Sequence, residues 1–274
     1  MQDSGIKNFL TGIGITSAFV TILWSLWPNE LNSIAKGSEL KFILAIIGIN
    51  LSISLYTIRK KKKLSINLTK LVKANIYYGD LFQNKGIVVI PVNEYFDTIV
   101  DEKIISSNTL HGYFVKQFFT GNDKELKQQI TKSLSTVLPL EKNNTRKQGN
   151  KNKYPLGTVA QVKKEGRISY LVALTRFNEN NRAEVKKSEY QRVLCDLFDY
   201  IEQYSQGTQV SIPLIGGGHS GVDLSKQKLL EFLLFSIALN DKLTLINGIN
   251  VVLHKSIEND IDLNKIHYHY IMGA

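Results

Sequence analysis

Apolar residues beyond residue 70 follow two alternating patterns. Short runs rich in Val and Ile have the length of buried strands, and they are separated by stretches in which apolar residues recur every three or four positions, as on one face of a helix. Alternating strands and helices predict an α/β fold, with a sheet covered by helices on both faces. The expected strands cover residues 74–78, 86–92, 157–162, 168–174, 210–215 and 249–254, and the expected helices cover 122–138, 190–201 and 224–239, with 98–119 partly helical.

The first sixty residues have a different pattern. Residues 9–27 and 42–58 are uncharged runs, each close to the length of a membrane-spanning helix, and five basic residues, 59–63, follow the second run. The positive-inside rule places that cluster, and hence both termini, in the cytoplasm. We therefore predict a transmembrane hairpin over 1–63 and a cytoplasmic domain over 64–274. A cleaved signal peptide is disfavoured because a second run follows the first.

Small and polar residues recur within these two runs at helical spacing. Ser17, Thr21 and Ser25 lie four residues apart in the first run, as do Asn50 and Ser54 in the second. An asparagine within an apolar helix needs a hydrogen-bonding partner. The pattern leaves two hypotheses open: these faces join the two helices of one hairpin, or they join one chain to another.

The net charge of +10 is concentrated in two segments, residues 59–63 and residues 141–153. A nucleic-acid-binding surface would spread basic residues over a groove with interleaved aromatic residues, so no nucleic-acid partner is expected. The second segment is rich in Asn and lacks periodicity, which predicts a mobile loop. The single cysteine, Cys195, excludes an internal disulfide, and its helical surroundings predict a packed thiol. His267 and His269 alternate with tyrosines, which indicates a terminal strand or tail and no metal site.

Residues 210–223 read V-S-I-P-L-I-G-G-G-H-S-G-V-D, an apolar strand followed by a glycine loop and then a helix. Glycine permits positive φ and close approach of a ligand to the backbone, and the N–H groups at a helix start favour anions. This arrangement predicts a phosphate-binding loop, and a tight turn without a ligand is the alternative. The candidate residues in the loop are Gly216, Gly217, Gly218, His219, Ser220 and Gly221.

Several other polar residues directly follow expected strands. Asp80, Asn93 and Arg176 do so, and ligands of α/β sheets bind beyond the carboxyl ends of strands. Asp80 could instead be a turn residue, and Asn93 could close a strand end. His111 and His219 fit the polar lining of a pocket better than a water-activating role, because no paired carboxylate or metal spacing accompanies them. The further candidates near these positions are Leu81, Asn108, His111 and Phe177.

Three marks in order resemble those of macro domains: Gly79-Asp80-Leu81, the run that ends Val92-Asn93, and the glycine loop. The resemblance extends from about residue 71 to the C-terminus. It implies a three-layer α/β/α sandwich that binds ADP-ribose or its derivatives. Asp80 would accept a hydrogen bond from the adenine amino group, Asn93 would bind the distal ribose, and the N–H groups of residues 217–221 would hold the diphosphate.

A two-span hairpin before such a domain, together with Y-L-V-A-L-T-R-F-N at 170–178, resembles the membrane-anchored effectors of Thoeris anti-phage defence, the macro-domain form of ThsA. The resemblance implies a protein of the bacterial inner membrane, coupled to a TIR-domain enzyme that makes an ADP-ribose-derived signal, histidine-ADP-ribose, from NAD. Binding would drive homo-oligomerisation, disruption of the lipid bilayer and abortive infection, with no catalysis and no cofactor besides the ligand.

The alternative function is a membrane-tethered ADP-ribosyl hydrolase or phosphoesterase. Hydrolytic macro domains usually carry an Asn-rich strand end followed by a glycine run, whereas here residues 90–96 read I-P-V-N-E-Y-F and residues 106–112, S-S-N-T-L-H-G, stand in place of that run. This departure favours a receptor over an enzyme. A third hypothesis, a channel or adaptor without a nucleotide ligand, would require the glycine loop to be buried against other protein.

Overall fold

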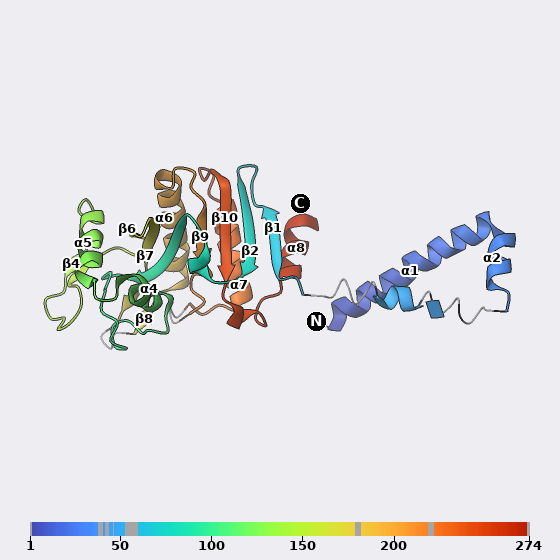
Figure 1. Cartoon of the computed structure of the whole chain (residues 1–274), viewed down its shortest axis with the longest axis horizontal. Helices are drawn as coiled ribbons and strands as arrows, with labels where there is room; N and C mark the ends of the chain where they lie inside the picture. The colour runs from blue at the N-terminus through green and yellow to red at the C-terminus, as the bar shows by residue number, and fades with distance from the viewer. Residues whose placement is uncertain are drawn as a thin grey trace. The chain divides into compact units, whose positions relative to one another are not determined.

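The computed structural model of the 274-residue chain describes residues 2–37, 41, 44–45, 47–52, 60–178, 182–218 and 222–272. The chain divides into two compact units, Met1–Lys60 and Lys61–Ala274 (Figure 1). Strand β1 (Lys63–Asn67) begins directly after this division.

The described residues of the first unit include α1 (Gln2–Leu26), α2 (Pro28–Ala35) and a further helical stretch at residues 44–45 and 47–52. The hydroxyl of Thr16 lies 2.8 Å from Oδ1 of Asn50, and Asn50 is buried. This contact joins the two uncharged runs within one chain, which favours the first of the two hypotheses for their polar residues. Ser54 lies outside the described residues.

Across the residues described, no helix is both long enough and apolar enough to cross a membrane. This finding gives no support to the predicted spans at 9–27 and 42–58, and it contradicts the predicted location in the bacterial inner membrane with both termini cytoplasmic. The prediction relied on the absence of charge, which is a weaker condition than apolarity, since hydroxyl side chains such as Thr21 and Ser25 recur along α1. Residues 42–43, 46 and 53–58 of the second run lie outside the described residues.

The second unit is built on one mixed sheet with the strand order β1-β2-β10-β9-β3-β7-β6, and β8 pairs with the end of β7. The five central strands are parallel, whereas β1 and β6 are antiparallel to their neighbours. The carboxyl ends of all five parallel strands therefore lie along one edge. The remaining strands are β2 (Val72–Tyr78), β3 (Ile87–Asn93), β6 (Val159–Lys164), β7 (Arg167–Phe177), β8 (Ala183–Glu184), β9 (Val210–Pro213) and β10 (Leu245–Leu253).

Helices cover both faces of this sheet. On one face, α4 (Leu110–Phe119) and α5 (Asp123–Ser133) pack on a core that contains Val88 and Ile90 of β3. On the other face, α6 (Lys187–Tyr204), α7 (Lys226–Ala238) and α8 (Leu263–Met272) pack on a core that contains Ile87 and Val89 (Figure 1). A strand buried on both faces is apolar at every position, which explains the continuous run in the sequence. The predicted three-layer α/β fold is confirmed.

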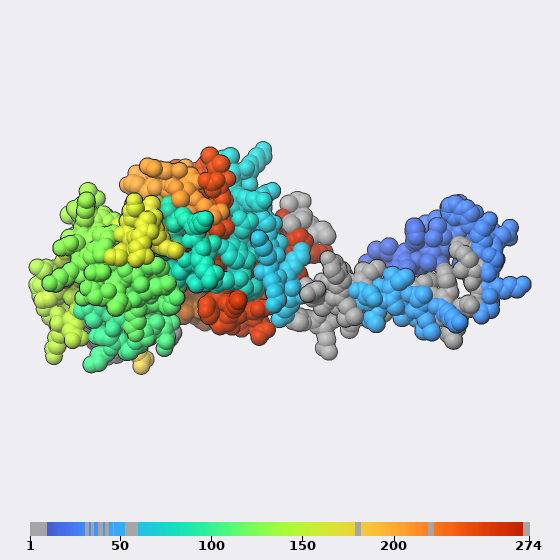
Figure 2. All heavy atoms as spheres, viewed as in Figure 1, coloured from blue at the N-terminus to red at the C-terminus, as the bar shows by residue number. Residues whose placement is uncertain are grey.

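The edge strand β1 was not predicted from the sequence, whereas its neighbour β2 was expected at residues 74–78. Residues of β1 alternate between exposed and buried along its length, and in Figure 2 the cyan atoms of this part of the chain lie at the surface. The basic residue Lys63 begins β1, although the sequence placed it in the basic flank of a membrane hairpin. An edge strand with one solvated face carries few apolar residues, so its pattern is hard to detect.

Three local predictions are wrong. Residues 263–272 form α8, so His267 and His269 lie on a helix rather than on a strand or tail. Cys195 is exposed, because it falls between the buried positions of α6. Partial desolvation of its sulfur and the nearby aspartates raise the pKa of its thiol. The aperiodic segment 141–153 contains a short ladder of β4 (Glu141–Lys142) and β5 (Asn152–Lys153).

Gly86 shows how tightly the sheet is packed at the start of β3. Its φ is +87°, and a Cβ at this position would lie 2.4 Å from the carbonyl oxygen of Gln209. We expect Gly86→Ala to lower the free energy of unfolding by about 2 kcal/mol or more, measured by denaturant unfolding. Gly121→Ala is the matched control, since Gly121 has a φ of +73° with nothing within 4 Å, and it should cost about 1 kcal/mol. Equal losses would contradict the importance of the close approach.

Candidate functional site

The carboxyl edge of the parallel strands collects most of the residues predicted to bind a ligand. Asp80 follows β2, Asn93 ends β3, Arg176 and Phe177 end β7, and the glycines follow β9. Hydrogen bonds join neighbouring strand ends there: Gly79 N donates to Leu253 O at 2.9 Å, and Glu94 N donates to Thr175 O at 2.9 Å. The topology therefore brings together residues that lie far apart in the sequence (Figure 1).

Asp80 caps the short 3-10 helix η1 (Leu81–Gln83). Its Oδ1 accepts a hydrogen bond from Phe82 N at 2.9 Å, and the residue is exposed. Because one carboxylate oxygen is sufficient for the cap, the other remains able to accept from a ligand. Leu81 differs, because it is buried in the core beneath α4 and its side chain supports the turn.

Asn93 is buried at the end of β3. Its Oδ1 accepts hydrogen bonds from Tyr95 N at 3.0 Å and Asp97 N at 3.5 Å. In the part of the chain that the structure describes, no group accepts from its Nδ2. The side chain is thus fixed through its oxygen, and its amide nitrogen can donate to a ligand.

The glycine loop turns sharply after β9. Gly216 has a φ of +83°, and a Cβ on it would lie 3.1 Å from a methyl group of Val222 and 3.2 Å from the ring of Tyr190. Gly217 N donates to Leu214 O at 3.2 Å, whereas the N–H groups of Gly216 and Gly218 have no acceptor among the described residues. His219, Ser220 and Gly221 lie outside the described residues.

The helix after the loop begins slightly later than the sequence predicts. Helix α7 starts at Lys226, and Ser225 caps it by accepting from Lys228 N at 3.3 Å. The N–H groups of this helix are therefore not contiguous with the glycines. The loop's own amides, rather than the first turn of α7, are the nearer donors for an anion.

Two predicted site residues come from the segment before α4. Asn108 is exposed in a turn, and its N–H faces Ser106 Oγ at 3.3 Å. His111 is 7% exposed, and burial lowers the pKa of its imidazole to about 4, partly offset by a hydrogen bond to the backbone of Asp97. The structure thus places His111 behind the turn that follows β3, where it supports that turn.

Arg176 and Phe177 are linked through a buried carboxylate that sequence reasoning missed. Arg176 forms an ion pair with Glu189, and its Nε lies 4.0 Å from Oε2 of Glu94. Phe177 N donates to the other Glu94 oxygen at 3.1 Å. Lys153 lies 3.8 Å from Oε2. Burial raises the pKa of Glu94, while the Phe177 N–H and the two cations favour its ionised form.

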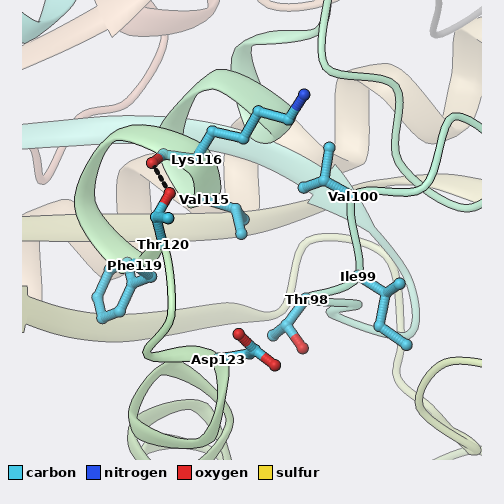
Figure 3. A pocket seen from close by; sticks show the side chains of 8 residues that line it. All are labelled: Thr98, Ile99, Val100, Val115, Lys116, Phe119, Thr120 and Asp123. Atoms are coloured by element: carbon cyan, nitrogen blue, oxygen red, sulfur yellow. Dashed lines mark hydrogen bonds between the residues drawn. The ribbon is translucent and has the colours of Figure 1, made fainter.

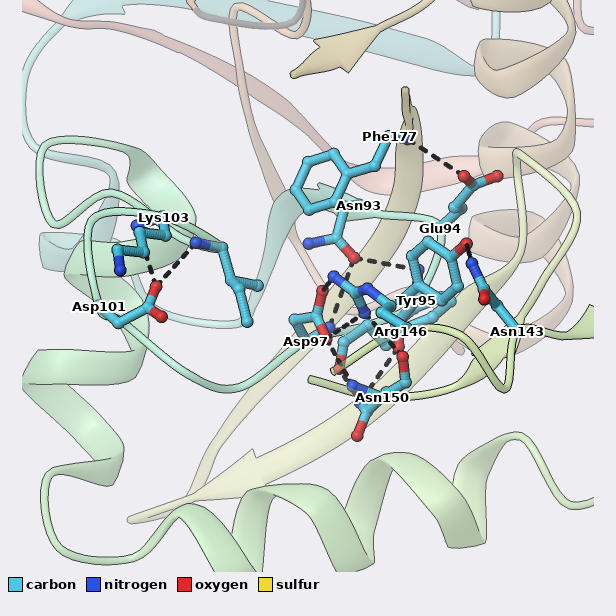
Figure 4. A network of polar contacts seen from close by, with 12 residues as sticks. Asn93, Glu94, Tyr95, Asp97, Asp101, Lys103, Asn143, Arg146, Asn150 and Phe177 are labelled. Atoms are coloured by element: carbon cyan, nitrogen blue, oxygen red, sulfur yellow. Dashed lines mark hydrogen bonds and ion pairs between the residues drawn. The ribbon is translucent and has the colours of Figure 1, made fainter. Parts of the chain in front are cut away.

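A second buried carboxylate, Asp97, was also missed. It forms two hydrogen bonds with the guanidinium of Arg146, at 2.9 and 2.7 Å, and accepts from Asn150 N at 2.7 Å (Figure 4). Arg146 and Asn150 belong to the aperiodic segment 141–153. A loop that packs on the protein through single contacts has no periodic pattern in the sequence. The segment could therefore be recognised only by its many Asn and basic residues, and its contact with Asp97 could not be predicted.

A surface hollow of about 270 Å³ lies beside this region (Figure 3). It is formed by residues 98–100, by the last turns of α4 around Val115 and Phe119, and by Asp123. Among the described residues, none of those predicted to bind the ligand lines this hollow.

The strand order and the polar residues at the carboxyl edge define a macro-domain fold. Residues 74–254 match the family described as Thoeris protein ThsA, Macro domain, and the chain belongs to this family. The chain is 29% identical over 238 residues to the Thoeris protein ThsA of Bacillus amyloliquefaciens (strain Y2), an alignment that spans 82% of this chain and 78% of that protein.

Solved structures resemble the chain in fold. The macrodomain of Oceanobacillus iheyensis with ADP has a TM-score of 0.53 and 13% sequence identity, covering 75% of this chain and 95% of that one. A mutant of the same macrodomain with ADPR has a TM-score of 0.52 and 13% identity, covering 75% and 97%. At this identity the likeness supports the shared fold alone.

Proposed function

We propose that this chain is a Thoeris effector whose macro domain is the receptor for an ADP-ribose-derived signal. The observation that carries the proposal is the convergence of Asp80, Asn93 and the glycine loop at one sheet edge in a chain of the ThsA family. The Oceanobacillus iheyensis macrodomain, solved with ADP and in mutant form with ADPR, supports this class of ligand.

The chemistry of the three positions suits the parts of such a ligand. The second carboxylate oxygen of Asp80 accepts from the adenine amino group, and Nδ2 of Asn93 donates to a hydroxyl of the distal ribose. The N–H groups of Gly216 and Gly218, which have no acceptor among the described residues, donate to the diphosphate together with that of Gly221. Arg176, exposed at the carboxyl end of β7 and paired with Glu189, adds a basic group to the same edge of the sheet.

The proposed signal is histidine-ADP-ribose made from NAD by a TIR-domain enzyme, and its binding promotes homo-oligomerisation in anti-phage defence. A ligand shifts an assembly equilibrium only if it binds the assembled state more tightly. Light scattering of the purified chain should therefore show a larger mass with the signal than without it. An unchanged mass at saturating signal would reject the assembly step while leaving binding intact.

An ADP-ribosyl hydrolase or phosphoesterase is the second candidate. Glu94 follows Asn93 directly, and His111 contacts the backbone of Asp97 in the same turn. Both have shifted pKa values, as groups that activate water often do. Both side chains are buried and face protein groups, and a general base must reach the water it activates. These contacts favour a receptor. Release of ADP-ribose from an ADP-ribosylated protein, lost in Asn93→Ala, would favour the enzyme.

The binding proposal is tested by calorimetry of the full chain with ADP-ribose. Asp80→Asn retains an oxygen for the Phe82 cap but replaces the other with a donor that opposes the adenine amino group. We expect a loss of affinity on the order of 10- to 100-fold. Asp241→Asn is the control, because Asp241 is an exposed residue before β10, at the opposite edge of the sheet. Equal affinity of wild type and Asp80→Asn would reject the assignment.

A further inference from the structure

The segment between β4 and β5, residues 143–151, is here called the strap, and it docks on the turn formed by residues 93–97. Asp97 accepts from both terminal nitrogens of Arg146, at 2.9 and 2.7 Å, and from Asn150 N at 2.7 Å. The side chains of Arg146 and Asp97 are 8% and 0% exposed. The strap is therefore attached by a buried, bidentate ion pair, which fixes geometry as well as charge (Figure 4).

The turn under the strap is strained. Phe96 has a φ of +51°, a left-handed conformation that costs a non-glycine residue about 1 kcal/mol or more. The side-chain amide of Asn150 donates to Tyr95 O at 3.1 Å and to Phe96 O at 2.7 Å. The strap thus makes hydrogen bonds on both sides of the strained peptide, and such a conformation persists only where its surroundings hold it.

The same turn holds Asn93. Both N–H groups that donate to Asn93 Oδ1 belong to it, Tyr95 N at 3.0 Å and Asp97 N at 3.5 Å. The Arg146 guanidinium lies 4.1 Å from the centre of the Tyr95 ring and 5.7 Å from that of Phe177. A continuous set of contacts therefore joins the strap to the amide that faces the distal ribose.

We propose that Arg146 is a positioning residue, through which the strap sets the specificity of the site for the part of the ligand beyond the diphosphate. This inference rests on the proposed function. With the ion pair formed, the turn presents Asn93 in the orientation that distinguishes ADP-ribose from ADP. The other basic residues of the strap, Lys147 and Lys151, are exposed and take no part in this contact.

The test compares two probes, ADP-ribose and ADP, by calorimetry on the full chain. Arg146→Ala should weaken ADP-ribose binding about tenfold and change ADP binding less than about twofold, because ADP lacks the distal ribose. Arg146→Lys, which keeps the charge but loses the bidentate geometry, should fall between. Lys147→Ala is the matched control: it removes the same charge from the same strap, and it should bind both probes as wild type does.

Arg146→Ala leaves the Asp97 carboxylate buried and unpaired, so a second variant protects the test against misfolding. Asp97→Asn with Arg146→Gln removes both charges together and should show the same selective loss. Proportional loss of both probes, or unchanged ADP-ribose binding, would overturn the role of Arg146. Failure of wild type to bind ADP-ribose would overturn the ligand assignment and this role together, so the two failures are distinguishable.

Discussion

Asp97→Ala is expected to lower the free energy of unfolding by about 3 to 5 kcal/mol. The carboxylate is fully buried and receives three hydrogen bonds from Arg146 and Asn150. Removing it leaves a guanidinium of 8% exposure without its counter-charge and also releases the Asn150 N–H. Breaking a buried pair costs more than the pair contributes, because the remaining charge cannot regain its water. Denaturant unfolding with an unchanged slope would measure the loss.

An exposed ion pair of similar length is the control for this result. Lys187 and Asp223 lie 3.1 Å apart, but their side chains are 57% and 97% exposed. Solvent screens such a pair, so Asp223→Ala should change stability by less than about 0.5 kcal/mol. Asp97→Asn should lie between the two, since the amide oxygen still accepts from Asn150 N. A loss below about 1 kcal/mol for Asp97→Ala would mean that the strap is not held by this pair.

The parallel core of the sheet could be predicted because buried strands appear in the sequence as continuous apolar runs. Strand β3 is covered on both faces, so its residues from Ile87 to Val92 are nearly all apolar and stand out from their surroundings. Helix α6 shows the corresponding helical period, with Val193, Leu194 and Leu197 buried. Once five such strands are parallel, the residues that follow them must share one edge, and this is why Asp80 and Asn93 could be paired with the glycine loop from sequence.

The parts that could not be predicted depend on single contacts between distant residues. Arg146 and Asp97 are 49 positions apart, and neither belongs to a periodic pattern. The positive φ of Phe96 could not be predicted either, because nothing in the residue type indicates a left-handed conformation. His111 could be recognised as a polar residue near the site, but only the packing of α4 shows that it supports the turn from behind.

The absence of charge in residues 9–27 was the signal that misled most. Helix α1 has large side chains at its surface, among them Ile15, Phe19 and Leu26, yet no described helix meets the combined requirement of length and apolarity. Uncharged sequence is compatible with several environments, and the hydroxyls of Thr16 and Thr21 are bonded within the first unit. The sequence predicted that Asn50 needs a hydrogen-bonding partner, and in the structure the hydroxyl of Thr16 donates to its Oδ1.

His111→Gln is expected to flatten the dependence of stability on pH between about 6.5 and 4. Burial lowers the pKa of this imidazole from its ordinary value of 6.5 to about 4 in the folded protein. Between these two values the unfolded chain binds a proton that the folded chain does not, so stability is present above pH 6.5 and is lost as the pH falls through this window. The window spans about 2.5 pH units at about 1.4 kcal/mol each, which gives a loss of about 3 kcal/mol in the wild type.

The difference between the two proteins isolates this imidazole from other groups. Glu94 contributes with the opposite sign, since its raised pKa makes folding less favourable as the pH rises above the ordinary value of 4.5, but it is present in both proteins. Glutamine can still donate to the backbone of Asp97 and carries no titrating group. Unfolding free energies measured at pH 7 and pH 4.5 should therefore diverge by about 2 to 3 kcal/mol more in the wild type than in the variant. Parallel pH profiles would show that the pKa of His111 is the same in the folded and the unfolded protein, and would contradict its burial behind the turn that holds Asn93.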